Sequence, residues 1–354
     1  MGKPIISGIQ QIGIGVSEVY EAWKWYRKHF GMDIPMFDEA AEAALMLPYT
    51  GGEPRSRHAI LALNIQGGGG MEIWQYTSRT PVAPDFQPVL GDLGIYIAKV
   101  KSKDVQATYR FLKSKNANII SDLVQSPEGK PHFFLKDPYG NLFEVVSSDA
   151  WFKSTNMTTG GMYGAVIGVS DIEQSLKLYA DVLAYDQVVY DETGSFEDLQ
   201  SIEGGNGEFR RILLRHKPEN RKGAFSKMLG KTEIELVQAM DRKGKKIFEN
   251  RLWGDLGYIH LCFDVNRMQD LKKFCESKGF PFTVDSNPGF DMGEAAGHFS
   301  YIEDPDGTLI EFVEAHRIPI MKKINWYLDL RSRDPEKALP NWMLKTLAFN
   351  RVKD

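Results

Sequence analysis

The feature of this sequence that most limits its fold is an internal repeat. The stretches FFLKDPYGNLFEVV (residues 133–146) and SYIEDPDGTLIEFV (residues 300–313) share an apolar strand, an Asp-Pro-x-Gly turn and a second apolar strand. Proline fixes φ early in such a turn and glycine tolerates a positive φ at its end, which is typical of a connection between antiparallel strands. The repeat therefore predicts duplication of a β-rich unit.

The repeated unit extends beyond the turn and occurs four times. Four segments alternate apolar and other residues every second position, which predicts strands, and each reaches a valine before a helical pattern begins. Each unit then closes with a strand that holds a glutamate among apolar residues. We align the units on Val16, Val100, Val169 and Val265. The position five residues before each valine is Gln11, Ile95, Gly164 and His260, and the closing glutamates are Glu72, Glu144, Glu235 and Glu311.

The spacing within the units indicates a duplicated pair. The aligned first-strand position and the closing glutamate are separated by 61, 49, 71 and 51 residues, a long-short-long-short pattern. We therefore expect an N-terminal domain over residues 1–150, a C-terminal domain over residues 160–316, and a C-terminal extension over residues 317–354. The length of 354 residues suits two domains at roughly 100–200 residues each. Residues after Pro340 in the extension predict a short amphipathic helix.

A strand, a helix and about three further strands, repeated four times with a glutamate near the end of each unit, resemble the vicinal-oxygen-chelate superfamily. This superfamily includes glyoxalase I, extradiol dioxygenases and antibiotic-sequestering proteins. The resemblance covers about residues 5–315. It implies an α+β fold in which four βαβββ modules pair into two half-open mixed β-sheet barrels, and it implies a metal ion inside a paired barrel.

In that superfamily one first-strand and one last-strand residue from each module of a pair bind the metal. If unit one pairs with unit four, the implied ligands are Gln11, Glu72, His260 and Glu311, the ligand types of glyoxalase I. We favour this crossed pairing because Ile95 and Gly164 cannot donate a lone pair from their side chains. If neighbouring units pair instead, as in extradiol dioxygenases, Glu235 becomes an alternative ligand beside His260 and Glu311.

The chemistry implied by the resemblance is metal-assisted proton transfer. One imidazole, one amide and two carboxylates suit a divalent ion such as Zn, Ni, Mn, Co or Fe. Such an ion acidifies a C–H next to a coordinated carbonyl, and a carboxylate takes the proton, giving an enediolate. We assign Glu311 as the base and Glu72 to the opposite face of the substrate, in a glyoxalase-like lyase or isomerase. The alternatives are an iron-dependent ring-cleaving dioxygenase and a ligand-sequestering protein without catalysis.

Strand alternation suggests which side chains line the substrate pocket. Trp74 and Tyr76 share a strand face with Glu72, and Tyr258 shares one with His260, so we expect these three to contact substrate. Gly13 and Gly15 share the face of Gln11 and are expected to leave room for a ligand. We interpret two other histidines, His132 and His298, as surface loop residues, and Glu144 and Glu235 as remnants of duplication.

The composition of the chain limits the kinds of partner that we expect it to bind. Net charge is −4 from 43 basic and 47 acidic residues, without a basic run, so we expect no nucleic acid. No stretch reaches the ~20 apolar residues of a membrane helix, and the start lacks a secretory layout. The two cysteines, Cys262 and Cys275, are expected to be reduced thiols in a cytoplasmic protein. We expect a small-molecule substrate with adjacent oxygens, and a monomer or homodimer.

Overall fold

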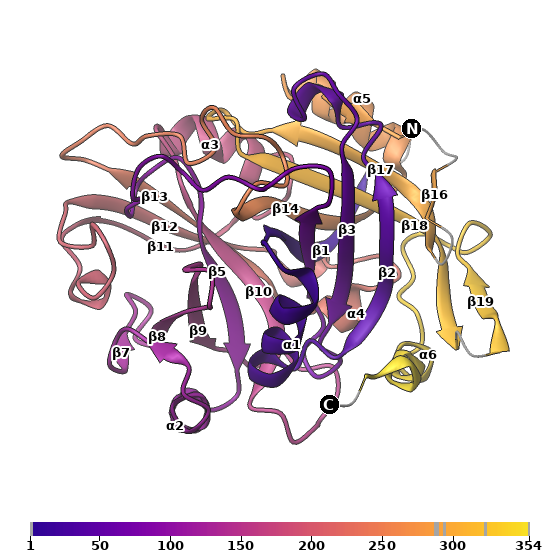
Figure 1. The fold of residues 1–354 in the computed structure, drawn as a ribbon, viewed down its shortest axis with the longest axis horizontal. Helices are drawn as coiled ribbons and strands as arrows, with labels where there is room; N and C mark the ends of the chain where they lie inside the picture. The colour runs from indigo at the N-terminus through magenta and orange to yellow at the C-terminus, as the bar shows by residue number, and fades with distance from the viewer. Residues whose placement is uncertain (1–2, 287–289, 293–294, 322–323, 353–354) are drawn as a thin grey trace.

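The structure is a computed structural model that describes residues 3–286, 290–292, 295–321 and 324–352. Two large mixed sheets lie side by side, with short helices packed outside them (Figure 1). This α+β architecture confirms the fold class expected from the repeat. The sheets are called sheet one and sheet two below.

Sheet one combines strands from the two ends of the chain, in the order β15-β17-β18-β14-β1-β4-β3-β2, with β16 and β19 paired at β17 and β18. Its strands are β1 (Ile5–Gly15), β2 (Ile34–Glu42), β3 (Ser56–Leu63), β4 (Gly70–Tyr76), β14 (Gly257–Asn266), β15 (Val284–Asp285), β16 (Phe290–Met292), β17 (Ala295–Glu303), β18 (Leu309–Met321) and β19 (Trp326–Asp329).

Sheet two is built from the middle of the chain, in the order β11-β12-β13-β10-β5-β9-β8-β6, with β7 paired at β8. Its strands are β5 (Gly94–Ser102), β6 (Asn118–Ile119), β7 (Val124–Gln125), β8 (Pro131–Lys136), β9 (Leu142–Ser147), β10 (Thr159–Gly168), β11 (Gln187–Gly194), β12 (Phe209–Arg215) and β13 (Glu233–Ala239).

The junction within each sheet shows which units pair. In sheet one β1 of unit one runs antiparallel to β14 of unit four, and Gln11 lies opposite Cys262. In sheet two β5 of unit two runs antiparallel to β10 of unit three. The crossed pairing is therefore the arrangement in this structure, and neighbour pairing is not.

Each unit has one helix after its first strand, as the helical patterns predicted. The helices α1, α2 and α5 are amphipathic, and each turns apolar residues such as Tyr26, Leu112 and Leu271 into the core. The helices are α1 (Val19–Phe30), α2 (Val105–Ser114), α3 (Ile172–Tyr179), α4 (Ser226–Leu229), α5 (Met268–Ser277) and α6 (Asn341–Lys345).

The two Asp-Pro-x-Gly segments form the expected turns and also connect the units. Asp137 accepts backbone N–H groups from within its own turn, and its second carboxylate oxygen accepts the hydroxyl of Tyr26 on α1 at 2.6 Å. Asp304 makes the same contacts in its turn and with Tyr179 on α3, at 2.9 Å. The turn at Asp137 in sheet two is thus hydrogen-bonded to the helix that follows β1 of sheet one. The turn at Asp304 in sheet one is hydrogen-bonded to the helix that follows β10 of sheet two.

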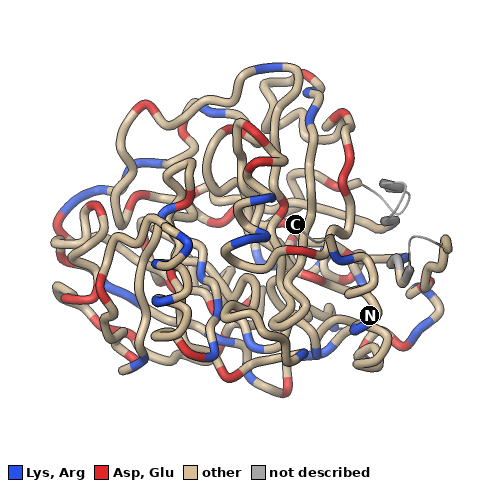
Figure 2. Tube along the Cα trace, turned by 60° about the horizontal axis from the view of Figure 1, so that its bottom comes forward, with Lys and Arg blue, Asp and Glu red and all other residues tan. Residues whose placement is uncertain are grey.

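The C-terminal extension packs on sheet one. It holds the predicted helix, α6, followed by a 3-10 turn (Thr346–Asn350), and buries Leu344 and Leu347 completely. In the described part of the chain, no helix combines the length and apolarity needed to cross a membrane. Lys and Arg are interspersed with Asp and Glu over the described part of the chain (Figure 2).

Candidate metal centre

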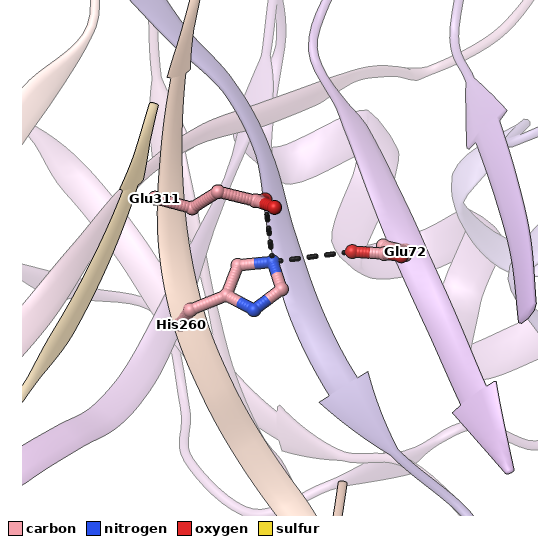
Figure 3. A group of neighbouring side chains, drawn as sticks. All are labelled: Glu72, His260 and Glu311. Atoms are coloured by element: carbon pink, nitrogen blue, oxygen red, sulfur yellow. Dashed lines mark ion pairs between the residues drawn. The ribbon is translucent and has the colours of Figure 1, made fainter. Parts of the chain in front are cut away.

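Three of the side chains predicted as ligands converge in sheet one. Glu72 on β4, His260 on β14 and Glu311 on β18 point toward one centre from separate strands (Figure 3). Their ligand atoms all lie within 4.8 Å of one another. Residues 239 positions apart in the chain, Glu72 and Glu311, are thus brought together by the β1–β14 junction.

The distances within this cluster are short and the side chains are buried. The imidazole Nε2 of His260 lies 3.2 Å from a carboxylate oxygen of Glu72 and 3.1 Å from one of Glu311. Gln11 joins them from β1, with its Nε2 at 3.3 Å from Glu72 and 3.5 Å from Glu311. The exposed fractions are 8% for Glu72, 0% for His260, 7% for Glu311 and 3% for Gln11. Four buried polar groups therefore lie together.

The charges of the cluster perturb one another. Burial by itself lowers the pKa of His260, but the carboxylates of Glu311 and Glu72 outweigh it and raise this pKa to about 10. Burial raises the pKa of Glu311, and the neighbouring His260 and Tyr301 lower it to a net value below normal. In the protein as described, a positive charge is thus strongly favoured between the two carboxylates.

One buried atom of the cluster makes no hydrogen bond, the amide oxygen of Gln11. A buried polar atom without a partner is costly, so this oxygen marks a place where a further group belongs. Two carboxylates, one imidazole nitrogen and one amide oxygen match a divalent cation in donor type and in charge, so the residues present fit a metal ion.

Sequence reasoning missed a fifth member, Tyr301 on β17. Its hydroxyl donates to Oε1 of Glu311 at 2.8 Å and lies 3.4 Å from Nδ1 of His260. In the repeat alignment the matching residue of unit two is Phe134, which also lies across the strand pair from its closing glutamate, Glu144. The added hydroxyl in one copy was the signal in the sequence.

The small residues of β1 serve neighbouring protein groups rather than a ligand, which corrects the prediction from strand alternation. A Cβ on Gly13 would lie 2.4 Å from the imidazole of His260, and one on Gly15 would lie 2.0 Å from the carbonyl oxygen of Asp255. Gly13 is therefore required for His260 to reach the centre.

A cavity of about 370 Å³ opens beside the cluster and is lined in part by Gln11, Glu72 and Glu311. Trp74 lines it, as predicted, and packs edge-on against Trp253, which the sequence reasoning did not find, with ring centroids 4.6 Å apart. Tyr76 is not among the lining residues: its ring supports Trp74 at 4.8 Å and its hydroxyl donates to the backbone of Trp253.

Tyr258 does not line the cavity, so its predicted substrate contact is wrong for this structure. The β1–β14 ladder shifts register between Gly13 and Ile14, which pair with His260 and Tyr258. This irregularity breaks the alternation, so residues 258 and 260 do not share a face. The Tyr258 hydroxyl instead donates to the carbonyl of Leu142 at 2.6 Å, inside the core between the sheets.

The equivalent positions of sheet two hold an ion-pair network. Nζ of Lys99 lies 2.7 Å from Glu235 and 3.2 Å from Glu144, and all three side chains are buried. Glu235 also accepts from Arg211 at 2.8 Å. Glu235, the alternative ligand under neighbour pairing, is thus separated from His260 and bound by two cations.

Both histidines interpreted as surface residues are buried in strands, so that interpretation is wrong. His132 on β8 is 1% exposed and its Nδ1 lies 2.7 Å from Glu144. His298 on β17 is 2% exposed, and its Nε2 lies 2.5 Å from Asp285. Each lies in a strand where the sequence analysis expected a loop, and each forms an ion pair with a carboxylate.

The paired βαβββ modules and the cluster between them define a class of protein in which a buried polar centre faces a cavity inside a half-open barrel. A sequence model of the Glyoxalase/Bleomycin resistance protein/Dioxygenase superfamily matches residues 8–145 and 162–312. The chain belongs to this superfamily.

Individual relatives are distant. The lactoylglutathione lyase of Schizosaccharomyces pombe is 25% identical over 194 residues, which cover 52% of this chain and 59% of that enzyme. The match therefore spans less than two thirds of that relative's length.

Among solved structures, a mutant of glyoxalase I from Zea mays is similar with a TM-score of 0.55 and 15% identity, over 87% of this chain and 92% of that chain. A putative dioxygenase from Bacillus subtilis is similar with a TM-score of 0.56 and 15% identity, over 88% and 86%. At these identities the two structures show the shared fold alone.

Proposed function

We propose that this protein is a metal-dependent lyase or isomerase of the glyoxalase type, acting on a small substrate with adjacent oxygens. The observation that supports this most is the convergence of Glu72, His260 and Glu311 on one buried centre beside an open cavity. Gln11 completes the set: its amide nitrogen lies 3.3 Å from Glu72 and 3.5 Å from Glu311, and rotation of the amide by about 180° would present its oxygen to an ion. A divalent ion held there supplies Lewis-acid stabilisation of charge that develops on a substrate oxygen.

The residues of the chain supply the remaining chemistry. Glu311 is the base that takes a proton from the carbon next to the substrate carbonyl, and Glu72 flanks the opposite face. Tyr301 orients Glu311 through its 2.8 Å hydrogen bond and favours the ionised carboxylate. Trp74 and Trp253 line the cavity beside the centre with apolar surface, and a less polar surrounding strengthens electrostatic contacts.

Metal analysis tests the proposal directly. We expect the protein, stripped of metal and reconstituted with Zn, Ni, Mn, Co or Fe in separate preparations, to hold one divalent ion per chain. His260→Ala and Gln11→Ala are expected to lose the same ion, whereas His132→Ala, which alters a buried histidine of sheet two, is expected to retain it. Protein that holds no ion after reconstitution would favour a ligand-sequestering role and overturn the proposal.

Deuterium exchange tests the proposed activity. We expect the reconstituted protein to exchange deuterium from solvent into the C–H beside the carbonyl of 2-hydroxyacetophenone, which carries adjacent oxygens. Consumption of oxygen with ring cleavage of a catechol, without such exchange, would support a dioxygenase instead. The cytoplasmic location and the state as monomer or homodimer stay predictions.

A further inference from the structure

The walls of the cavity beside the cluster are mainly apolar. Beyond Gln11, Glu72 and Glu311 at one end, aromatic and aliphatic side chains from β2, β3, β4 and β18 line it. They include Phe37, Leu61, Leu63, Trp74, Val313 and Ile318. A volume of about 370 Å³ falls in the range of sites that enclose most of a drug-sized molecule, roughly 300–1,000 Å³.

Part of this wall comes from outside units one and four. Phe225, Met228 and Leu229 reach it from α4 and the residue before it, which belong to unit three, and Leu347 reaches it from the C-terminal extension. These four side chains are at most 6% exposed. Segments that are not part of the paired modules of sheet one thus close the cavity with apolar surface.

The basic side chains among the described lining residues are already engaged with protein groups. Arg57 donates to the carbonyl of Glu39 at 2.8 Å, and Arg317 lies 4.8 Å from the ring centre of Tyr327. His298 is paired with Asp285. A substrate that carried several charges into this cavity would lose water without gaining matched partners, which is unfavourable.

We propose that the substrate carries its adjacent oxygens on a bulky, uncharged apolar body, such as an aryl group, rather than on a charged peptide. The oxygens face Glu72, His260 and Glu311, and the body packs against Trp74, Met228 and the neighbouring apolar wall. This inference rests on the proposed function, because it uses the cluster to orient the substrate.

Two hydroxamates separate the contributions of the oxygens and of the body. Acetohydroxamate and biphenyl-4-carbohydroxamate present the same pair of adjacent oxygens and differ in apolar surface. Titrated into the metal-reconstituted protein by calorimetry, the biphenyl compound is expected to bind at least about 30-fold more tightly, because burial of apolar surface contributes roughly 25 cal/mol per Å².

Two variants test whether the gain in affinity comes from the apolar wall of the cavity. Met228→Asp is expected to weaken the biphenyl compound at least about tenfold and to leave acetohydroxamate unchanged, because a buried carboxylate opposes an apolar ligand. Met240→Asp is the matched control, since Met240 is 49% exposed and is not among the residues that line the cavity. If Met228→Asp does not fold, Phe225→Ala shortens the same wall without adding a charge and serves the same comparison.

The outcomes distinguish this inference from the proposed function. Equal affinities for the two hydroxamates would overturn the apolar substrate class and leave the metal site standing. Tighter binding of a hydroxamate carried on the sulfur of glutathione than of the biphenyl compound would also overturn it. Binding of neither hydroxamate, or binding that is unchanged when the metal is removed, would overturn the proposed function itself.

Discussion

The two sheets carry the same four structural positions and use them in opposite ways. In sheet one these positions hold Gln11, Glu72, His260 and Glu311 beside a cavity of about 370 Å³. In sheet two they hold Ile95, Glu144, Gly164 and Glu235, and the cavity there is about 20 Å³. The topology is shared, so the difference arises from side chains.

The difference lies in the source of the positive charge. Buried carboxylates are stable only when a cation neutralises them. In sheet two the cation is a side chain of the protein: Nζ of Lys99 lies within 3.3 Å of Glu144, Glu233 and Glu235. Sheet one has Asp264, an acid, at the position that aligns with Lys99, and its two glutamates face His260 and an open cavity. In sheet one the group that faces both acids is the His260 imidazole, which unlike the Lys99 ammonium becomes a metal ligand once it loses its proton, so this acidic pair is suited to bind a divalent ion.

A second difference between the sheets is the placement of a glycine at one pair of neighbouring parallel strands. On β1 and β4, the larger residue is on the first strand: Gln11 pairs with Gly70. On β10 and β13 the order is reversed: Gly164 pairs with Glu233. A Cβ on Gly164 would lie 1.9 Å from the carbonyl oxygen of Glu233, so this position of sheet two excludes a ligand side chain in this geometry.

The largest expected effect contrasts the closing glutamates of units four and two. Glu311→Gln removes the proposed base from sheet one, and we expect deuterium exchange into 2-hydroxyacetophenone to fall by about 10²–10⁴-fold while the metal is retained. Glu144→Gln makes the same change in sheet two and should leave exchange unaltered. Unchanged exchange in Glu311→Gln would refute the assignment of the base.

The second effect concerns stability. Lys99→Met leaves three buried carboxylates short of a cation, and we expect the free energy of unfolding in urea to fall by about 3–5 kcal/mol. Lys217→Met is the control, since the Lys217–Asp186 pair is on the surface, where solvent and salt screen the attraction and leave it little effect on stability. A loss in Lys99→Met no larger than that of the control would show that the network of sheet two does not stabilise the fold.

The sequence determined much of the fold in advance, because it repeats. Four alternating strands with glutamates at matching positions located Gln11, Glu72, His260 and Glu311, and the ligand chemistry of Ile95 and Gly164 favoured the crossed pairing found in the structure. These features are local patterns that recur, so each copy supports the alignment of the others.

Features that depend on a single irregularity or on distant packing were not predictable in this way. The register shift beside Gly13 moved Tyr258 to the core, and alternation alone gives no sign of a shift. The wall residue Met228 comes from an irregular segment of unit three that no repeat marks. Lys99 carried a usable signal: a lysine between apolar residues of a strand is buried only when it is paired.

The third effect is the pH dependence of stability, which we expect to differ between two buried histidines. Burial lowers the pKa of His132, but Glu144 and Asp198 outweigh it and raise this pKa to about 9. A folded-state pKa above the unfolded value of about 6.5 gives stability that is fully present below pH 6.5 and is lost as pH rises through 9. The stability advantage of wild type over His132→Gln should shrink by about tenfold in the unfolding constant per pH unit within that window.

His216 provides the control for this titration. Burial lowers its pKa to about 4, so it is neutral throughout the window from pH 6.5 to pH 9. We expect the difference between wild type and His216→Gln to stay constant over that range in urea titrations. A constant difference for His132→Gln as well would show that His132 carries no extra proton in the folded state.

The smallest expected effect tests the hydroxyl that distinguishes the two repeats. Tyr301→Phe removes the 2.8 Å hydrogen bond to Glu311 and keeps the ring, so metal affinity is expected to fall by about ten- to a hundredfold. Tyr190→Phe is the matched variant in sheet two, where the Tyr190 hydroxyl hydrogen-bonds Glu235, and should leave metal affinity unchanged. Competition with a chelator measures both. Equal affinities for wild type and Tyr301→Phe would mean that Glu311 is oriented by the strand alone, and that the difference between the sheets rests on Lys99 and on the exchange of Gln11 for Gly164.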